Sequence, residues 1–389
     1  MEALKYISAD SHVVEPAEFW VTRLDKKYQD QAPRVIVKEN KEGTPTFAFR
    51  LPGLFDLPIL AELFAAGQNM DSSRELLRED ADSFKKFVTS SAGYDQARPG
   101  AWDPVERIKD QELDGVSAEV LYTSLGMPLY QITDTELQQA CFSVYNTWLG
   151  EFCSSNPKRL LGLALISMWD IPSAIKELQR CAKIGLRGAE IWGNAPEDKP
   201  YSNPMYDPFW AAAQDLNMPI SLHVGTSVMP RRPGGGGTML SSRMEGFTNA
   251  IHPIQQAIAA LTLNGVLERY PGMKIVSAEN DVGWLPHLVW RLDHAYRHYG
   301  VLSGIKLKEM PSFYLKRQLF GTFEDEPFSA DSLQRFGADN FMWASDYPHG
   351  VSTWPRSRNA IEKDFAGVPK ETRQKIILEN VKRCYNIEA

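Results

Sequence analysis

Short apolar runs rich in β-branched residues recur along the chain, and amphipathic stretches with helical spacing lie between them. This alternation is typical of βα units on a parallel sheet, and it constrains the fold more than any other feature of the sequence. Eight runs are predicted to be strands: residues 6–12, 117–123, 160–166, 187–192, 219–225, 274–279, 317–323 and 341–346. Eight strands with intervening helices favour a (β/α)8 TIM barrel, in the α/β class, over an open sheet.

One long insertion separates the first predicted strand from the second, at about residues 20–105. It is rich in proline and aromatic residues and includes a charged, helix-like run at 71–88. Insertions of this length usually form a lid, a dimer arm or a pocket wall, and the sequence leaves these three roles open. No internal repeat or linker interrupts the rest, so we predict a single domain over residues 1–389.

Charge and cysteine usage limit the class of partner. The net charge of −7 argues against binding to nucleic acid or to an anionic membrane surface, both of which draw on clustered Lys and Arg. No signal peptide and no long apolar span is found, and the four cysteines form no CxxC pair. We therefore expect a cytoplasmic protein that acts on a small molecule and does not cross a membrane.

Polar residues stand at the ends of several predicted strands, where a barrel gathers its chemistry on one face. Asp10 and His12 end the first strand, His223 lies near the end of the fifth, and Asp346 ends the eighth. A strand period of two points Asp10 and His12 to the same side. Because buried carboxylates and imidazoles are costly without a cation, these four residues predict a bound divalent metal ion.

Several motifs resemble the amidohydrolase superfamily: "DSH" on the first strand, "LHVG" on the fifth, the downstream "IHP", "GWLPHLVWRLD" and "WASDYPH" on the eighth. The branch that these motifs resemble most includes aminocarboxymuconate-semialdehyde decarboxylase and γ-resorcylate decarboxylase. The resemblance implies a mononuclear centre on Asp10, His12, His223 and Asp346, with His252 as a catalytic histidine. It also implies a homodimer, which the partly apolar helical stretch at 284–299 supports.

Asp10 departs from the pattern of that branch, whose decarboxylases carry His or Glu at this position. A shorter carboxylate leaves the ion farther away or bridged by water. Two histidines and two carboxylates suit Zn²⁺, Mn²⁺ or Fe²⁺, and we expect zinc.

Two reactions fit the same residues. In the first, the enzyme is a decarboxylase of an aromatic or unsaturated carboxylic acid, and Asp346, His252 or water bound to the metal protonates the carbon that loses carbon dioxide. In the second, it is a hydrolase of an ester, thioester, lactone or amide, and His252 activates water held by the metal. The resemblance favours the decarboxylase, whereas Asp10 and the insertion favour the hydrolase.

Four further residues are candidates for supporting roles. Glu279 either orients a ligand or forms a salt bridge with Arg187 on the barrel floor, and both alternatives stay open. His349 either contacts substrate or a ligand, or caps its own loop. Glu15 is close enough to the first strand to reach the pocket, although a solvated glutamate is the commoner case at such a position.

Overall fold

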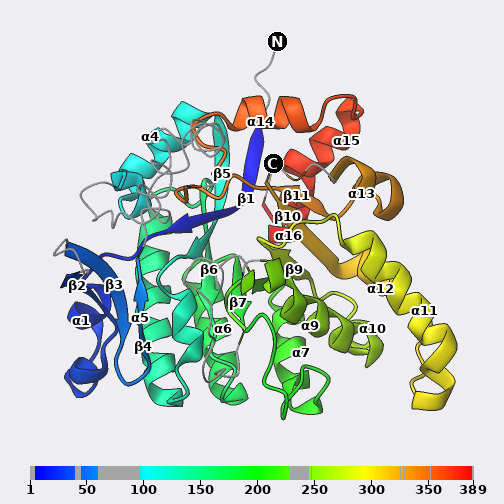
Figure 1. Cartoon of the computed structure of the whole chain (residues 1–389), viewed down its shortest axis with the longest axis horizontal. Helices are drawn as coiled ribbons and strands as arrows, with labels where there is room; N and C mark the ends of the chain where they lie inside the picture. The colour runs from blue at the N-terminus through cyan, green and yellow to red at the C-terminus, as the bar shows by residue number, and fades with distance from the viewer. Residues whose placement is uncertain are drawn as a thin grey trace. The chain divides into compact units, whose positions relative to one another are not determined.

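The computed structural model describes residues 5–39, 45–59, 97–227, 245–246, 248–324, 326, 329–350 and 352–387. Eight strands follow one another in chain order in a parallel sheet (Figure 1): β1 (Tyr6–Val13), β5 (Val116–Thr123), β6 (Leu160–Leu165), β7 (Gly188–Ile191), β8 (Ile220–His223), β9 (Ile275–Ala278), β10 (Leu319–Phe323) and β11 (Phe341–Trp343). Each corresponds to one predicted strand. The predicted (β/α)8 barrel is therefore confirmed.

Helices connect these strands, and several begin at residues that cap them. Asp103, Asp134 and Asp170 each accept a main-chain N–H with the side chain, at the starts of three of the helices. The main helices are α4 (Pro104–Asp114), α5 (Thr135–Ser154), α6 (Ile171–Lys183), α7 (Asp207–Asp215), α9 (Ile251–Leu263), α10 (Val266–Arg269), α11 (Leu285–Ser303), α12 (Pro311–Gln318), α13 (Ser329–Phe336), α14 (Ser357–Asp364), α15 (Lys370–Gln374) and α16 (Asn380–Tyr385).

The chain divides into two compact units. The first consists of Met1–Leu163 and Ala344–Lys363, and the second of Ala164–Trp343 and Asp364–Ala389. Each unit draws on two separate segments of the chain, so neither is a contiguous domain that a linker would join to the other. The prediction of a single domain over residues 1–389 stays a prediction.

The insertion of the first unit contains a small antiparallel sheet of β2 (Arg34–Glu39), β3 (Pro45–Leu51) and β4 (Phe55–Pro58), in that order. The sheet lies beside α1 (Phe19–Arg23) and α5, as Figure 1 shows in blue and cyan-green. Aromatic side chains make this contact: the ring centroids of Trp20 and Phe49 are 5.4 Å apart, and those of Phe19 and Trp148 are 5.2 Å apart. The predicted helix at 71–88 lies outside the described residues.

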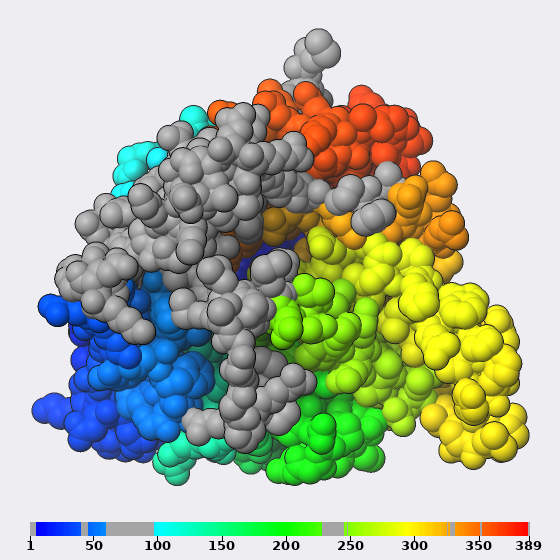
Figure 2. All heavy atoms as spheres, in the orientation of Figure 1, coloured from blue at the N-terminus to red at the C-terminus, as the bar shows by residue number. Residues whose placement is uncertain are grey.

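The strands of the second unit, β7 to β11, are buried along their whole length, as expected for a parallel sheet covered by helices. Its helix α11 ends in exposed apolar residues, with Val301 92% and Leu302 83% exposed. Figure 2 shows this segment in yellow on the surface. Among the described residues, no helix is both long and apolar enough to span a membrane.

Candidate metal centre

A β-bulge shapes the strand that carries the first two predicted ligands. In the parallel pairing of β1 with β5, Ser8 lies opposite Glu119 and Ser11 opposite Leu121, so β1 contains one extra residue. The Ser8 hydroxyl donates to the Asp10 carbonyl at 2.8 Å and accepts from the main-chain N–H of Ser345 at 2.8 Å. A strict period of two is therefore wrong for this strand, and the bulge sets the direction of Asp10.

His12 is fully buried, and its ring is held at one nitrogen. Nδ1 lies 2.7 Å from the carbonyl oxygen of Thr123, which can only accept, so Nδ1 carries the proton. In the neutral ring, Nε2 then presents its lone pair. Nε2 lies 3.5 Å from Oδ1 of Asp10 and 3.3 Å from Oδ1 of Asp346. The first unit thus brings three of the four predicted ligands together.

Asp346 follows β11 in a left-handed conformation with φ of 55°, which is uncommon for a residue other than glycine. Its main-chain N–H donates to the Asp10 carbonyl at 3.0 Å, which ties the two ligand-bearing segments together. Its Oδ1 lies 2.9 Å from Nδ1 of His349, whose Nε2 lies 3.1 Å from the Ser124 hydroxyl. Ligand atoms of His12, Asp346 and His349 all lie within 4.8 Å of one another.

In the second unit, His223 is the last residue of β8 and is fully buried. Nδ1 lies 2.9 Å from the carbonyl oxygen of Val224, so this ring also presents Nε2, which lies 3.4 Å from Oε2 of Glu279. Because a carboxylate and the lone pair of a neutral imidazole both accept, this contact does not fix the ring, and the orienting role of Glu279 stays a prediction. Arg187 precedes β7 and Glu279 follows β9. Because the strands are parallel, Arg187 lies at their N-terminal ends and Glu279 at their C-terminal ends. The structure therefore does not bring Arg187 to the site.

His252 is the second residue of α9, and its side chain is exposed. The flanking segment at 228–244 lies outside the described residues. Its catalytic role stays a prediction.

The donor chemistry of these residues fits a divalent cation. Asp10 is 2% exposed, and His12, His223 and Asp346 are fully buried. Carboxylates so deeply buried require strong compensation, and imidazole together with carboxylate is a donor set that zinc, iron and manganese accept.

Glu15 is fully buried, so the expectation of a solvated side chain is wrong. Its Oε1 accepts a hydrogen bond from the hydroxyl of Thr123, and its Oε2 accepts from the main-chain N–H of Leu125 at 2.8 Å. Burial raises the pKa of Glu15 to about 7. The signal in the sequence is its place between a buried strand and Pro16, where the chain has not yet reached the surface.

Arg107 of α4 is a residue that sequence reasoning missed. Its buried guanidinium donates to the carbonyl oxygens of His12 at 2.7 Å and of Tyr347 at 3.3 Å, and it pairs with Glu119 at 2.6 Å. Arg107 therefore holds the main chain at the predicted ligand His12 and at Tyr347, the residue after the predicted ligand Asp346. An arginine on an amphipathic helix resembles a solvated charge, so its sequence context gives no signal of this role.

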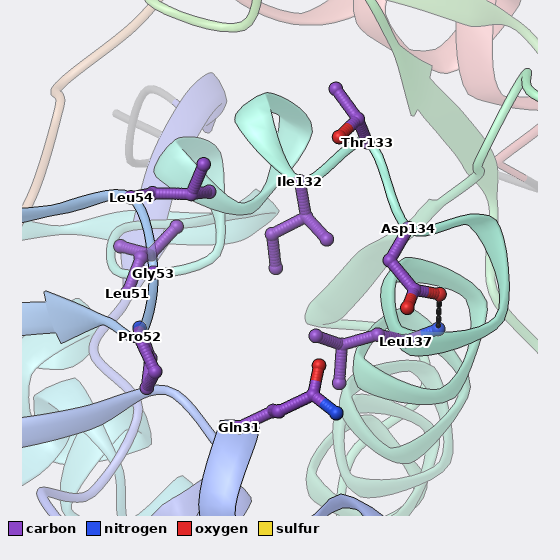
Figure 3. A pocket seen from close by; sticks show the side chains of 9 residues that line it. All are labelled: Gln31, Leu51, Pro52, Gly53, Leu54, Ile132, Thr133, Asp134 and Leu137. Carbon is purple, nitrogen blue, oxygen red and sulfur yellow. Dashed lines mark hydrogen bonds between the residues drawn. The ribbon is translucent and has the colours of Figure 1, made fainter.

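A separate pocket of about 130 Å³ lies in the first unit (Figure 3). The turn between β3 and β4 forms one wall, and the residues leading into α5 form another. Asp134 on that wall caps α5 by accepting from the N–H of Leu137 at 3.0 Å. Of the insertion, Gln31 and residues 51–54 line this pocket, and the role of the insertion as a lid, an arm or a pocket wall stays a prediction. None of the predicted ligands lines it.

Comparison with known proteins places the chain in a family. The amidohydrolase profile matches residues 74–387. The chain belongs to the amidohydrolase family. This amidohydrolase is 28% identical to the γ-resorcylate decarboxylase of Rhodococcus jostii (strain RHA1) over an alignment of 299 residues, and the match covers 69% of this chain and 87% of that protein. The predicted resemblance is confirmed.

Two solved structures are similar to this amidohydrolase in fold. The amidohydrolase map2389c from Mycobacterium avium subsp. paratuberculosis K-10 has a TM-score of 0.75 at 18% identity, with 99% of this chain and 100% of that chain covered. The dihydroxybenzoic acid decarboxylase from Polaromonas sp. JS666, solved with bound manganese and the inhibitor 2-nitroresorcinol, has a TM-score of 0.62 at 18% identity. That match covers 99% of this chain and 98% of that chain.

Proposed function

We propose that this amidohydrolase is a metal-dependent decarboxylase of an aromatic or unsaturated carboxylic acid. The observation that carries the proposal is the buried Asp10, His12 and Asp346 cluster of the first unit, with Nε2 of His12 facing both carboxylates. The relatedness to a γ-resorcylate decarboxylase supports the reaction class.

Four residues are proposed to hold one divalent ion: Asp10, His12, His223 and Asp346. Both histidines donate Nδ1–H to a main-chain carbonyl, which fixes the tautomer that leaves Nε2 for a metal. The expected metal is zinc, with manganese and iron as alternatives, and the manganese of the Polaromonas decarboxylase makes that alternative concrete. Metal analysis of protein purified without chelators decides among them.

The proposed reaction replaces a carboxyl group by a proton. A divalent ion held by these four residues would supply Lewis-acid stabilisation of negative charge on the substrate. Asp346 or His252 gives a proton to the carbon that bears the carboxyl group. The bond to the carboxyl carbon then breaks, its electron pair returns to the ring or double bond, and carbon dioxide leaves. The burial of Asp346 keeps bulk water from competing for that proton.

A substrate panel tests the reaction class. Purified protein supplied with Zn²⁺, Mn²⁺ or Fe²⁺ is mixed with ortho-hydroxybenzoates and unsaturated dicarboxylic acids, and the release of carbon dioxide is followed. Release that depends on the metal is the expected result. The same protein is mixed with esters, lactones and acyl thioesters, and alcohol or thiol release without any carbon dioxide identifies the hydrolase instead.

A pair of variants tests the assignment of roles. His223→Ala is expected to lose the ion, because it removes an Nε2 donor. His252→Ala is expected to keep the ion and to lose turnover. Full activity in both variants contradicts the site.

The quaternary state and location are part of the same proposal. The homodimer prediction draws on α11, where the aromatic side chains of Trp290 and Tyr299 are 53% and 65% exposed. Sedimentation tests it, and a species of 43.9 kDa at micromolar concentration contradicts it. A cytoplasmic location is supported by the four cysteines, all of them buried thiols.

A further inference from the structure

Glu15 stands at the centre of a small hydrogen-bonded turn that the proposed reaction does not use. The turn consists of Thr123 to Gly126 and begins at the last residue of β5. The Glu15 carboxylate accepts from the Thr123 hydroxyl and from the N–H of Leu125, and the N–H of Gly126 donates to Oγ1 of Thr123 at 2.7 Å. One buried carboxylate therefore holds the turn at Thr123 and at Leu125.

Two imidazoles of the candidate metal centre rest on this turn. Nδ1 of His12 donates to the carbonyl oxygen of Thr123, and Nε2 of His349 lies 3.1 Å from the hydroxyl of Ser124. The rings of His12 and His349 face each other with centroids 4.1 Å apart. A movement of the turn therefore turns both rings, and with them the direction in which Nε2 of His12 points.

Burial of the carboxylate has a cost that surface placement would avoid. Glu15 is fully buried, and taking a carboxylate out of water costs several kcal/mol, an order-of-magnitude figure, before its hydrogen bonds compensate. An apolar side chain at this position would fill the space without that cost. A carboxylate, however, offers two oxygens that only accept, and here one holds the Thr123 hydroxyl and the other the N–H of Leu125.

We propose that Glu15 is a positioning residue of the metal centre, which sets the orientation of His12 and His349 through the turn of Thr123 to Gly126. The proposal rests on the proposed function, because it requires His12 to bind the ion. Glu15 itself touches neither the ion nor the substrate.

The first test compares two substitutions of the same kind. Glu15→Gln keeps the shape but replaces one acceptor oxygen by an amide that donates, so one hydrogen bond of the turn is lost. Metal affinity, measured by calorimetry with Zn²⁺ or Mn²⁺, is expected to fall about 10-fold, as is usual when the group that orients a ligand is lost. Glu18→Gln, the same change at an exposed position nearby, is the control and should leave the affinity within about 2-fold.

A second pair of variants keeps the test decisive where Glu15→Gln fails to fold. Thr123→Val removes the hydroxyl and keeps the size, whereas Thr123→Ser keeps the hydroxyl. Weaker metal binding in Thr123→Val, rescued in Thr123→Ser, is the expected result. Asp114→Asn changes another buried carboxylate of the same unit, which bonds to Ser357. It should lower stability without weakening metal binding.

A spectroscopic readout separates positioning from stability. In metal-free protein, the hydrogen-bonded Nδ1–H proton of His12 should give a low-field NMR signal that His12→Ala removes. Glu15→Gln should shift or broaden this signal, and Asp114→Asn should not. If Glu15→Gln or Thr123→Val lowers the melting temperature but leaves both the signal and the metal affinity unchanged, Glu15 is merely structural and the proposal is wrong.

Failure of the proposed function gives a different result. In that case the wild-type protein binds none of the metals, or His12→Ala binds them as tightly as the wild type does. Normal binding by the wild type, loss in His12→Ala and unchanged binding in Glu15→Gln overturn the positioning role alone.

Discussion

The two histidines proposed to bind the metal are held in the same way by supports of different origin. His12, in the first unit, donates to the carbonyl of Thr123, which lies 111 residues further along the chain. His223, in the second unit, donates to the carbonyl of its neighbour Val224. The geometry of His12 therefore depends on long-range packing, whereas that of His223 is set by the end of its own strand.

The same contrast holds for the carboxylates beside them. Asp346 meets His12 and His349 and holds the main chain of β1 through the Asp10 carbonyl. Glu279 meets His223 while still 22% exposed. Substitutions that disturb the surroundings should therefore affect the first unit more than the second.

Removal of either imidazole ring should have the largest effect on metal affinity. The loss should be equally large in both units, so the difference between their supports should no longer matter. His12→Ala and His223→Ala each delete an imidazole donor, so metal affinity is expected to fall more than about 1,000-fold in both. Calorimetry and metal content after dialysis measure it. A variant that retains wild-type affinity excludes its histidine as a ligand.

Two glycines test how tightly each unit is packed around its site. A Cβ at Gly100 would collide with Oδ2 of Asp110, which Arg98 and Tyr347 hold in place. Gly100→Ala is therefore expected to lower the free energy of unfolding by about 3 kcal/mol.

The matched change in the second unit is Gly193→Ala. Its Cβ would lie 2.7 Å from the ends of the Ile254 and Ser227 side chains, which can rotate away. The expected loss is about 1 kcal/mol. Urea unfolding measures both variants, and an equal or larger loss at Gly193 contradicts the stronger constraint in the first unit.

Asp114 makes the stability of the first unit depend on pH. Burial raises its pKa to about 6 from an ordinary value of 3.8, so the folded state binds the proton more tightly than the unfolded state. The resulting stability is fully present below the ordinary pKa and is lost as the pH rises through about 6. The stability of the wild type relative to Asp114→Asn should fall by about 2 kcal/mol between about pH 4 and pH 7.

Glu326 is the matching group of the second unit. Burial also raises its pKa, while the N–H groups of Val282 and Gly283 oppose that rise. Glu326→Gln should therefore show a weaker pH dependence of the same sign. A pH dependence of stability larger for Glu326→Gln than for Asp114→Asn would contradict the expectation that the first unit responds more strongly.

The smallest expected effect concerns the residues beside the ligands. His349→Gln should weaken metal binding about 10-fold, because Asp346 loses a partner at 2.9 Å. Glu279→Gln should weaken it only about 3-fold, because the partly exposed carboxylate is screened by water and His223 keeps its bond to Val224. Titration calorimetry compares the two, and equal losses would show that both histidines depend equally on their neighbours.

Much of the fold follows from the sequence because its signals are local. Each strand of the sheet is predicted from an apolar run. The predicted bounds are one residue too narrow for β1 and β5 and one to three residues too wide for the others, as at 341–346 against β11 (Phe341–Trp343). The extra residues beyond β11 include Asp346, whose left-handed conformation ends the strand. The position of Asp346 in the sequence was thus informative even though its conformation was not predictable.

The site was predictable only as a set of residue types. Asp10 and His12 were expected to meet by simple alternation, but they meet through a bulge bonded to Ser345, which no period in the sequence encodes. Glu15 was expected to be solvated, and Arg107 was missed, because a charged residue near a surface element is normally solvated. Their partners lie about a hundred residues away in the chain, at Thr123 and His12 respectively.

The sequence by itself determined the alternation of strands and helices and the carboxylate and imidazole groups that end the strands. These features depend on periodicity and side-chain chemistry, which are properties of neighbouring residues. Only the tertiary structure decided which charges are buried and which nitrogen of each histidine is left for a metal. Those choices depend on hydrogen bonds between segments that meet only after the chain has folded, such as Glu15 with Thr123 and Asp10 with Asp346.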